Sequence, residues 1–320
     1  MQNFKHLDRH ASEAERMLHM MSKHWERRAI VKNDKSMIDY ESCFEHEHED
    51  FIESLLPFYY HPNWIKAPTE LKSDVLSWGW IIYNQKTIHI EVEIINPVLE
   101  DIILGKIPGA ADSLSKTVIS ETYVDEAYHT FMALNACNIV IAERNLQKII
   151  LPNYDLILSQ ENFISALDDQ DKKCLVRLAA ASISETMISA YLEKLSQNRT
   201  INRLCWMTAE AHRKDELAHA NLFIVLMKKI FPHLDKKKQD YYLSMLPYAI
   251  RWFGSQELRV WKVILEQINF PGYESMLDDI QFCGDIQIKN IDYSGAIKLV
   301  EGLERDVTPY FHQLELEVSH

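Results

Sequence analysis

The sequence has few residues that interrupt helices, since only eight glycines and ten prolines occur among 320 residues. Few tight turns can be made, so we expect an all-α fold. The sequence also lacks a run of about 18 apolar residues, the length that a membrane-spanning helix needs. Its first 28 residues are charged and amphipathic without an apolar centre, unlike a signal peptide. We therefore expect a cytoplasmic protein that does not enter a membrane.

Paired cysteines and net positive charge are also missing. No two cysteines form a Cys-x-x-Cys pair, so we expect reduced, buried thiols and no disulfide framework. The five are Cys43, Cys137, Cys174, Cys205 and Cys283. The formal net charge of −13 argues against a nucleic-acid surface and against an acidic carrier protein as partner. With 47% hydrophobic residues and no Pro/Gly/Ser-rich linker, residues 1–320 are expected to form a single domain with a large core.

The most informative feature that is present is a duplicated motif. The pattern Asp-Glu-x-x-His occurs as Asp125-Glu126-x-x-His129 and as Asp215-Glu216-x-x-His219. Residues three apart lie on one face of an α-helix, so each Glu and its His can point at a common centre. Two such helices, with one lone Glu from each of two others, supply the ligands of ferritin-like di-iron or di-manganese bundles. The sequence therefore predicts a ferritin-like four-helix bundle with additional flanking helices.

Chance matches to Glu-x-x-His also occur, at Glu45-x-x-His48 and Glu317-x-x-His320. Neither is preceded by Asp, the first lies in a highly charged run, and the second ends on the last residue. We interpret both as exposed. The duplicated motifs lie in apolar segments, where burying an unpaired carboxylate is costly and metal ligation relieves that cost.

A third ligand helix is predicted in residues 175–192, where Glu185 is the only carboxylate. Its neighbours are mostly Leu, Ala, Ile and Met, so Glu185 is expected to lie against the core. The alternative is a solvated stripe that also holds Ser182, Ser189 and Glu193.

The fourth segment, residues 78–98, offers two carboxylates, Glu91 and Glu93. Helical spacing puts Glu93 on a polar stripe with His89, whereas Glu91 aligns with apolar residues that include Ile95. We therefore select Glu91 as the ligand.

Further residues extend the constellation. His212 precedes Glu216 by four, so His212, Glu216 and His219 occupy positions i, i+4 and i+7 of one helical face. His212 is a candidate third imidazole ligand, the alternative being a partly buried histidine bonded to a backbone carbonyl. Asp125 and Asp215 cannot point in the same direction as the Glu beside each. We expect each to accept the free ring N–H of a histidine on the facing helix and so to fix its tautomer.

Helices are expected near residues 8–29, 70–104, 111–149, 170–197, 199–230 and 236–268, with shorter ones after 290. Pro97 lies inside the first ligand helix, about two turns after Glu91. We expect a kink there with a free carbonyl near the bundle core. The alternative is that the helix ends at Asn96.

These residues resemble the ferritin-like di-iron arylamine N-oxygenases. The likeness runs through Leu55-Leu56-Pro57-Phe58, His61-Pro62, Trp80-x-x-Tyr83-Asn84-x-x-Thr87-x-x-x-Glu91, Pro97, Glu126-x-x-His129, Glu185 and His212-x-x-x-Glu216-x-x-His219. The additional histidine before the last Glu-x-x-His is the most family-specific element. The resemblance implies seven metal ligands within a core of about residues 70–230. They are Glu91, Glu126, His129, Glu185, His212, Glu216 and His219.

The resemblance implies an enzyme that uses O2 to convert an aromatic amine through the hydroxylamine to the nitro compound. Two iron ions are the expected cofactor, because imidazole suits iron better than magnesium or calcium and two metals roughly 3.5–4 Å apart can act on O2 together. An external electron donor and a small-molecule amine are the expected partners, and a homodimer is compatible with the sequence. The alternatives are a di-iron C–H hydroxylase or desaturase and a non-catalytic metal-storage protein.

Substrate residues are indicated only by helix faces. Tyr83 and Thr87 precede Glu91 by two turns and one turn, and Tyr123 precedes Glu126 by one turn. All three are candidates for the pocket. Lys86 is a candidate for holding a substrate carboxylate, although its place on the polar stripe favours a solvated lysine.

Overall fold

The computed structural model describes residues 12–33, 41–282, 292–306 and 310, and every regular element in these ranges is helical. The predicted all-α class is therefore confirmed. None of the helices in these ranges is both long and apolar enough to span a bilayer.

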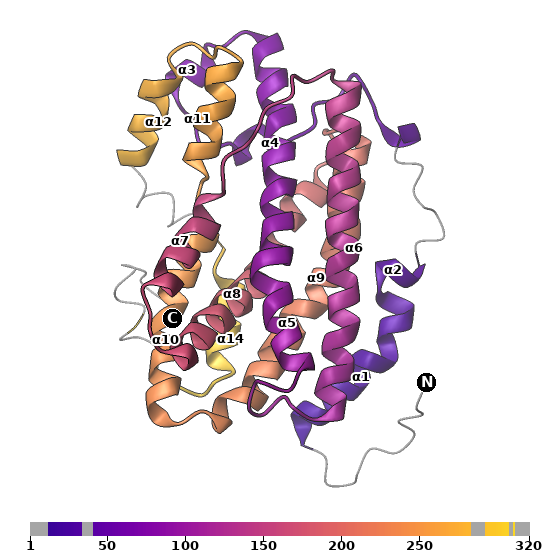
Figure 1. Cartoon of the computed structure of the whole chain (residues 1–320). Coiled ribbons are helices and arrows are strands. Elements are labelled where there is room, and N and C mark those ends of the chain that lie inside the picture. The colour runs from indigo at the N-terminus through magenta and orange to yellow at the C-terminus, as the bar shows by residue number, and fades with distance from the viewer. Residues whose placement is uncertain (1–11, 34–40, 283–291, 307–309, 311–320) are drawn as a thin grey trace.

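Four long helical segments form the central bundle (Figure 1). They are α4 (Thr69–His89), which continues through η3 (Ile90–Ile95) into α5 (Asn96–Ile103); α6 (Ser113–Glu143); α8 (Gln170–Gln197); and α9 (Arg203–Ile230). Asp112, Asp169 and Asn202 cap the last three of these segments, each side chain accepting hydrogen bonds from first-turn backbone N–H groups. Local sequence signals thus fix where these segments begin.

The first bundle helix departs from regular α-helical geometry just before Pro97, the region where a kink was predicted. Proline has no N–H to donate to the preceding turn. The six residues Ile90–Ile95 are π-helical, and the Asn96 N–H donates to the carbonyl of Glu91, five residues earlier. The chain then stays helical to Ile103, so the alternative that the helix ends at Asn96 is wrong. A π-helical turn rotates the following side chains relative to an unbroken α-helix, and here it includes Glu91.

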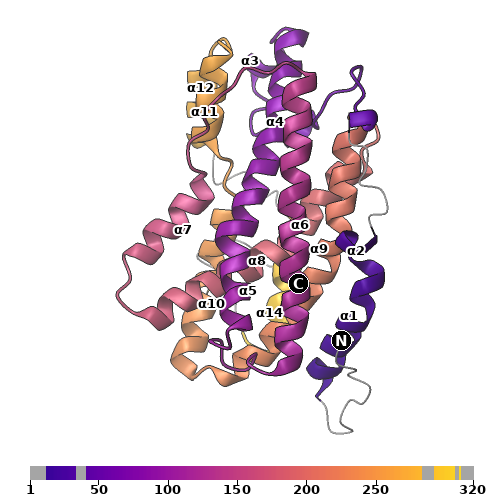
Figure 2. The same ribbon diagram turned by 45° about the vertical axis from the view of Figure 1, so that its right-hand side comes forward.

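Other helices surround the bundle (Figure 2). The longer ones are α1 (Glu13–Arg28), α7 (Asp155–Ser165), α10 (Lys236–Phe253), α11 (Leu258–Gln267), α12 (Tyr273–Phe282) and α14 (Ser294–Glu301). The short ones are α2 (Ile30–Asn33), η1 (Glu41–Cys43), η2 (Glu53–Leu55), α3 (Pro62–Ile65) and η4 (Phe231–His233). Helix α1 packs against α6 and α9, and α10 packs against α8.

The structure corrects several predicted helix boundaries. The helix predicted over 236–268 is two helices, because the chain turns after Gly254 and Glu257 adopts a left-handed φ of 55°. The helix predicted to reach residue 149 ends at Glu143, and Asn145 is left-handed at φ 51°. Helices α7 and α12 were missed. Of the predicted N-terminal helix, residues 8–11 lie outside the described ranges, as does Cys283.

A buried carboxylate outside the bundle connects three of its helical segments. Asp50 is fully buried and accepts hydrogen bonds from Ser77 on α4, from Arg144 after α6 and from Asn202 before α9. The Arg144 Nε to Asp50 Oδ2 distance is 2.9 Å. Because a buried charge is tolerated only when it is paired, this contact helps to hold the bundle helices in their relative positions.

Candidate metal centre

The structure brings the seven predicted ligands together from all four bundle segments. Each is buried, with exposed fractions between 0% and 6%. Glu91 comes from η3, Glu185 from α8, and the two Glu-x-x-His pairs and His212 from α6 and α9. The i, i+3 and i+4 spacings predicted a shared face, and the bundle turns these faces inward.

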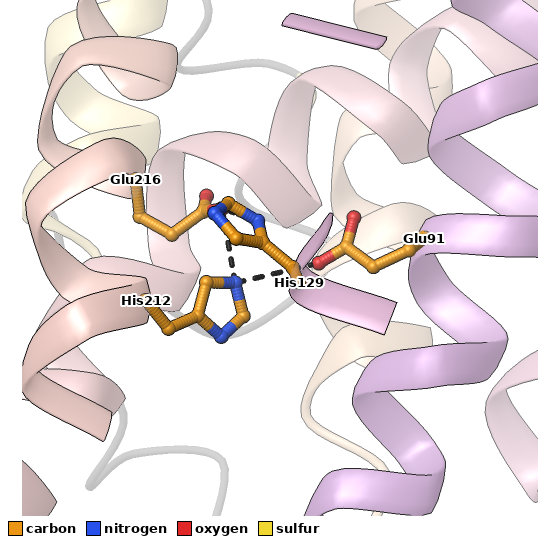
Figure 3. Close-up of side chains that lie close together, drawn as sticks. All are labelled: Glu91, His129, His212 and Glu216. Atoms are coloured by element: carbon orange, nitrogen blue, oxygen red, sulfur yellow. Dashed lines mark hydrogen bonds and ion pairs between the residues drawn. The ribbon is translucent and has the colours of Figure 1, made fainter. Parts of the chain in front are cut away.

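Four of these residues form a first group in which one donor atom from each lies within 4.8 Å of the others: Glu91, His129, His212 and Glu216. In Figure 3, His212 from α9 faces both carboxylates. Its Nε2 is 3.1 Å from Glu216 Oε1 and 3.5 Å from Glu91 Oε1. Within the described part of the chain, His212 is therefore hydrogen-bonded to Glu216 and not to a backbone carbonyl.

A second group, Glu126, His129, Glu216 and His219, meets the same 4.8 Å criterion and shares two members with the first. The carboxylate of Glu126 lies between two imidazoles. Its Oε2 is 2.8 Å from His129 Nδ1 and its Oε1 is 2.8 Å from His219 Nδ1. Two overlapping groups of this kind are compatible with two neighbouring metal ions.

Glu185 lies at the edge of these groups, with Oε2 3.9 Å from His219 Nδ1. It is 2% exposed, so the alternative of a solvated stripe is wrong. Neither of its carboxylate oxygens has a hydrogen-bond partner in the described part of the chain. A buried carboxylate without a donor is costly, and a metal ion is the partner that would satisfy it.

The crowded carboxylates have divergent pKa values. Burial, followed by the charge of Glu126, raises the pKa of Glu91 and of Glu185 well above the ordinary value. Burial acts in the same direction on Glu126 and Glu216, but adjacent imidazoles outweigh it. They lower the pKa of Glu126 to about 2 and that of Glu216 well below the ordinary value. The cluster cannot ionise all four carboxylates without added positive charge.

The imidazoles respond to the same charges. Burial lowers the pKa of His129 and His219, but Glu126 reverses the effect, and both pKa values are raised well above the ordinary value. For His212, burial and the charge of His129 dominate and lower the pKa. A neutral His212 therefore keeps a lone pair available for a metal.

The residues present suit two divalent cations. Four carboxylates balance four positive charges, and three imidazoles add donors without adding charge. Burial excludes water that would compete for the metals. The donor set therefore fits a two-metal centre.

Comparison with known proteins agrees with this geometry. Residues 11–303 match the family described as P-aminobenzoate N-oxygenase AurF. The chain belongs to this family. The 4-aminobenzoate N-oxygenase of Streptomyces thioluteus is 26% identical to it over 286 residues, which are 88% of this chain and 84% of that protein. Family membership confirms the resemblance that the motifs indicated, and it makes the protein an oxygenase with a buried metal-binding cluster.

The aspartate of each motif contacts a histidine of the other. Asp215 Oδ2 is 3.3 Å from His129 Nε2, and Asp125 Oδ2 is 3.2 Å from His219 Nε2. Both aspartates are fully buried. A ring whose Nε2–H donates to Asp presents the Nδ1 lone pair to the carboxylate cluster. These are the contacts that the predicted orienting role requires.

Sequence reasoning missed the residues behind these aspartates, which come from the end of α1. Trp25 Nε1 donates to Asp125 at 3.0 Å, and Arg28 Nη1 donates to Asp215 Oδ1 at 3.1 Å. Nothing in the sequence marks them, because about a hundred residues or more separate each donor from its acceptor.

The predicted pocket residues have different outcomes. Tyr83 stacks on Tyr191 with ring centroids 5.0 Å apart, and Thr87 is buried one turn before Glu91. Tyr123 lies elsewhere, because its hydroxyl donates to Glu100 at 3.0 Å in an exposed contact. The predicted place of Tyr123 in the pocket therefore has no support in the geometry.

Lys86 is neither solvated nor free to hold a carboxylate. Its ammonium donates to the carbonyls of Phe253 and Ser255 at 3.0 and 2.7 Å and pairs with Glu257 at 3.2 Å. These three contacts account for its three N–H groups. The interpretation of Lys86 as a solvated surface residue was wrong, because the end of α10 and the start of α11 cover this side of α4.

The chance matches behave as expected where they are described. His48 Nδ1 lies 3.4 Å from Glu45 Oε2, and both side chains are more than a third exposed. Glu317 and His320 lie outside the described residues.

Proposed function

We propose that this protein is a di-iron N-oxygenase that uses O2 to oxidise an arylamine nitrogen to the hydroxylamine or nitro level. The observation that carries the proposal is the buried cluster of three carboxylates and three imidazoles, with Glu185 at its edge, in a chain of the AurF family. Glu91, Glu126, Glu185 and Glu216 would hold two iron ions together with His129, His212 and His219. The bound irons would activate O2 with electrons from an external donor.

The ligands divide the work at this centre. Glu126 lies 2.8 Å from an imidazole nitrogen of His129 and of His219. Glu216 lies within 3.4 Å of nitrogens of all three imidazoles. Each carboxylate would therefore hold metal together with these histidines. Asp125 and Asp215 would hold His219 and His129 in the tautomer that leaves Nδ1 free for iron. Burial excludes bulk water, which protects a reactive oxidant from side reactions.

The substrate is proposed to be an amine, because the amine lone pair can act as the nucleophile and no strong C–H bond has to break. The Streptomyces thioluteus relative is named for 4-aminobenzoate. In this chain the ammonium of Lys86 is already engaged, so a carboxylate on the substrate would need another cation. We propose that Tyr83 and Thr87, on the turns before Glu91, line the substrate pocket.

A C–H hydroxylase or desaturase remains the alternative reaction on the same metals. The third imidazole and the family favour N-oxygenation. Metal storage is disfavoured, because a closed set of seven donors holds two metals and does not deliver iron to a mineral.

The direct test is product analysis. The anaerobically iron-loaded, chemically reduced protein is exposed to heavy-isotope O2 with a panel of aryl and alkyl amines, and the products are analysed by mass spectrometry. We expect a labelled hydroxylamine, nitroso or nitro product from at least one arylamine. Labelled oxygen found only on carbon would establish the C–H hydroxylase instead. If no amine gave a labelled product, both the N-oxygenase and the hydroxylase hypotheses would be contradicted.

A second test concerns Asp125 and Asp215. Replacing either with Asn keeps the side-chain shape but removes the charge that orients a histidine. We expect an intact fold with iron affinity or activity lowered about 10–100-fold. Iron titration, turnover and circular dichroism give the comparison, with Glu143→Gln at the exposed end of α6 as control. Wild-type iron binding and turnover in both variants would show that these carboxylates do not serve the metals.

A further inference from the structure

Helix α1 lies outside the bundle and contacts the aspartates of both Asp-Glu-x-x-His motifs. Its last turn and the following residues contact both buried aspartates. Trp25 Nε1 is 3.0 Å from each carboxylate oxygen of Asp125. Arg28 Nη1 is 3.1 Å from Asp215 Oδ1, and the backbone N–H of Ile30 donates to Asp215 Oδ2 at 3.2 Å. One short segment thus bonds to the aspartate of each motif.

Arg28 also spans the two aspartates. Its Nη2 lies 3.7 Å from Asp125 Oδ2, while its Nη1 makes the contact with Asp215. Both aspartates are fully buried, whereas the Arg28 side chain is 27% exposed. If two divalent metals balance the four glutamates, the two aspartates remain as buried negative charge. Arg28 supplies positive charge where that excess lies.

The aspartate oxygens are shared between α1 and the ligand histidines. Asp125 Oδ2 accepts from His219, and Asp215 Oδ2 accepts from His129. Because the donors from α1 fix the rotation of each carboxylate, they also fix the direction from which each imidazole can donate. The link runs from α1 through an aspartate to the ring nitrogen that faces the cluster.

We propose that Trp25 and Arg28 are positioning residues of the metal centre, and that α1 acts as a clamp that locks the orientation of His129 and His219 through Asp215 and Asp125. This proposal rests on the proposed metal site. It predicts that α1 controls how long the metals stay bound, in addition to covering a face of the bundle. Among the described residues, the side-chain hydrogen bonds and ion pairs of Trp25 and Arg28 that reach the site go to the aspartates and not to a predicted ligand.

The test measures metal release. The variants are Trp25→Phe, which keeps the ring but removes the N–H, and Arg28→Gln. The matched control is Arg27→Gln, which makes the same charge change at the exposed neighbouring position. Proteins loaded with Fe(II) or, separately, with Zn(II) are mixed anaerobically with excess chelator, and the release rate is followed. We expect each variant to release metal about tenfold faster. The control should stay within about twofold of wild type.

Two further measurements separate positioning from a loss of packing. The thermal unfolding midpoint of each metal-free variant shows whether the bundle itself is weakened, and we expect little change in Trp25→Phe. In the Asp215→Asn background, Arg28→Gln should accelerate release much less than in wild type, because the two changes act on one contact. If Arg28→Gln increased the release rate by the same factor in both backgrounds, Arg28 would not act through Asp215, and this part of the proposal would be overturned.

The zinc-release measurement tests the positioning role of α1 separately from the proposed oxygenase activity. Zinc release depends on the same ligands but needs no O2 or amine. Faster zinc release in the variants would uphold the clamp even if no amine were oxidised. Wild-type release rates in both variants would overturn it whatever the amine results, and a wild-type protein that binds no divalent metal would overturn both proposals.

Discussion

Replacing Glu126 or Glu216 with Ala is expected to leave the purified protein with little iron, whereas the wild-type chain should hold about two atoms. Glu126 lies between His129 and His219, and Glu216 belongs to both overlapping groups. Removing either carboxylate would therefore take away an oxygen donor that lies next to at least two of the imidazoles proposed to hold the metals. It also leaves fewer negative charges to balance four positive ones. Metal analysis of protein purified with iron in the growth medium measures the effect.

The control is Glu143→Ala on the same helix as Glu126. Its side chain is exposed and pairs only with His46 in the described contacts, so iron content should not change. Circular dichroism should show that both ligand variants remain helical. Stoichiometric zinc in the wild-type protein, or unchanged iron in either ligand variant, would be incompatible with the proposed di-iron centre.

Replacing His212 with Ala is expected to separate metal binding from reaction. The other six ligands remain, so the variant should keep iron near wild-type occupancy. It should lose most N-oxygenation, at least about tenfold, which corresponds to on the order of 1.4 kcal/mol in the barrier. His212 Nε2 faces Glu91 and Glu216 at 3.5 and 3.1 Å. A neutral imidazole there would donate electron density to bound iron without adding charge, and so would tune how strongly the iron oxidises a substrate.

The experiment loads the variant anaerobically, measures iron, adds O2 and follows amine oxidation in a single turnover. His46→Ala, at an exposed position, is the control. Full N-oxygenation in His212→Ala would make His212 a structural residue and remove the main residue-level reason for preferring an amine over a C–H bond. Loss of iron would mean instead that the seventh ligand is needed for binding.

The clustering of the candidate ligands could be predicted because their signal is local. Glu126 and His129 share a helix face by their spacing of three residues, and His212 joins Glu216 by a spacing of four. Burial then followed from the apolar residues around each motif, and a buried carboxylate requires a partner. The same logic separated Glu91 from Glu93, which is more than a third exposed and pairs with His89.

Contacts between distant segments could not be predicted. Lys86 and Glu257 are separated by more than 150 residues, and only the packing of α11 against α4 brings them together. Glu257, just before α11, adopts a left-handed backbone conformation. Glutamate is not one of the residue types that favour this conformation, so the sequence contained no sign of the turn. Tyr123 shows the same limit. Helical spacing placed it one turn before Glu126, but it could not show that its hydroxyl contacts Glu100 on another helix.

The sequence by itself determined the helical class and which buried carboxylates and imidazoles are candidate ligands, because helix formation and side-chain facing depend on residues three and four positions apart. The tertiary structure decided which donors share a group, how the aspartates cross between α6 and α9, and that α1 contacts both of them. These are through-space relations between segments far apart in the chain. Their geometry is set when the whole bundle packs, and no local spacing encodes it.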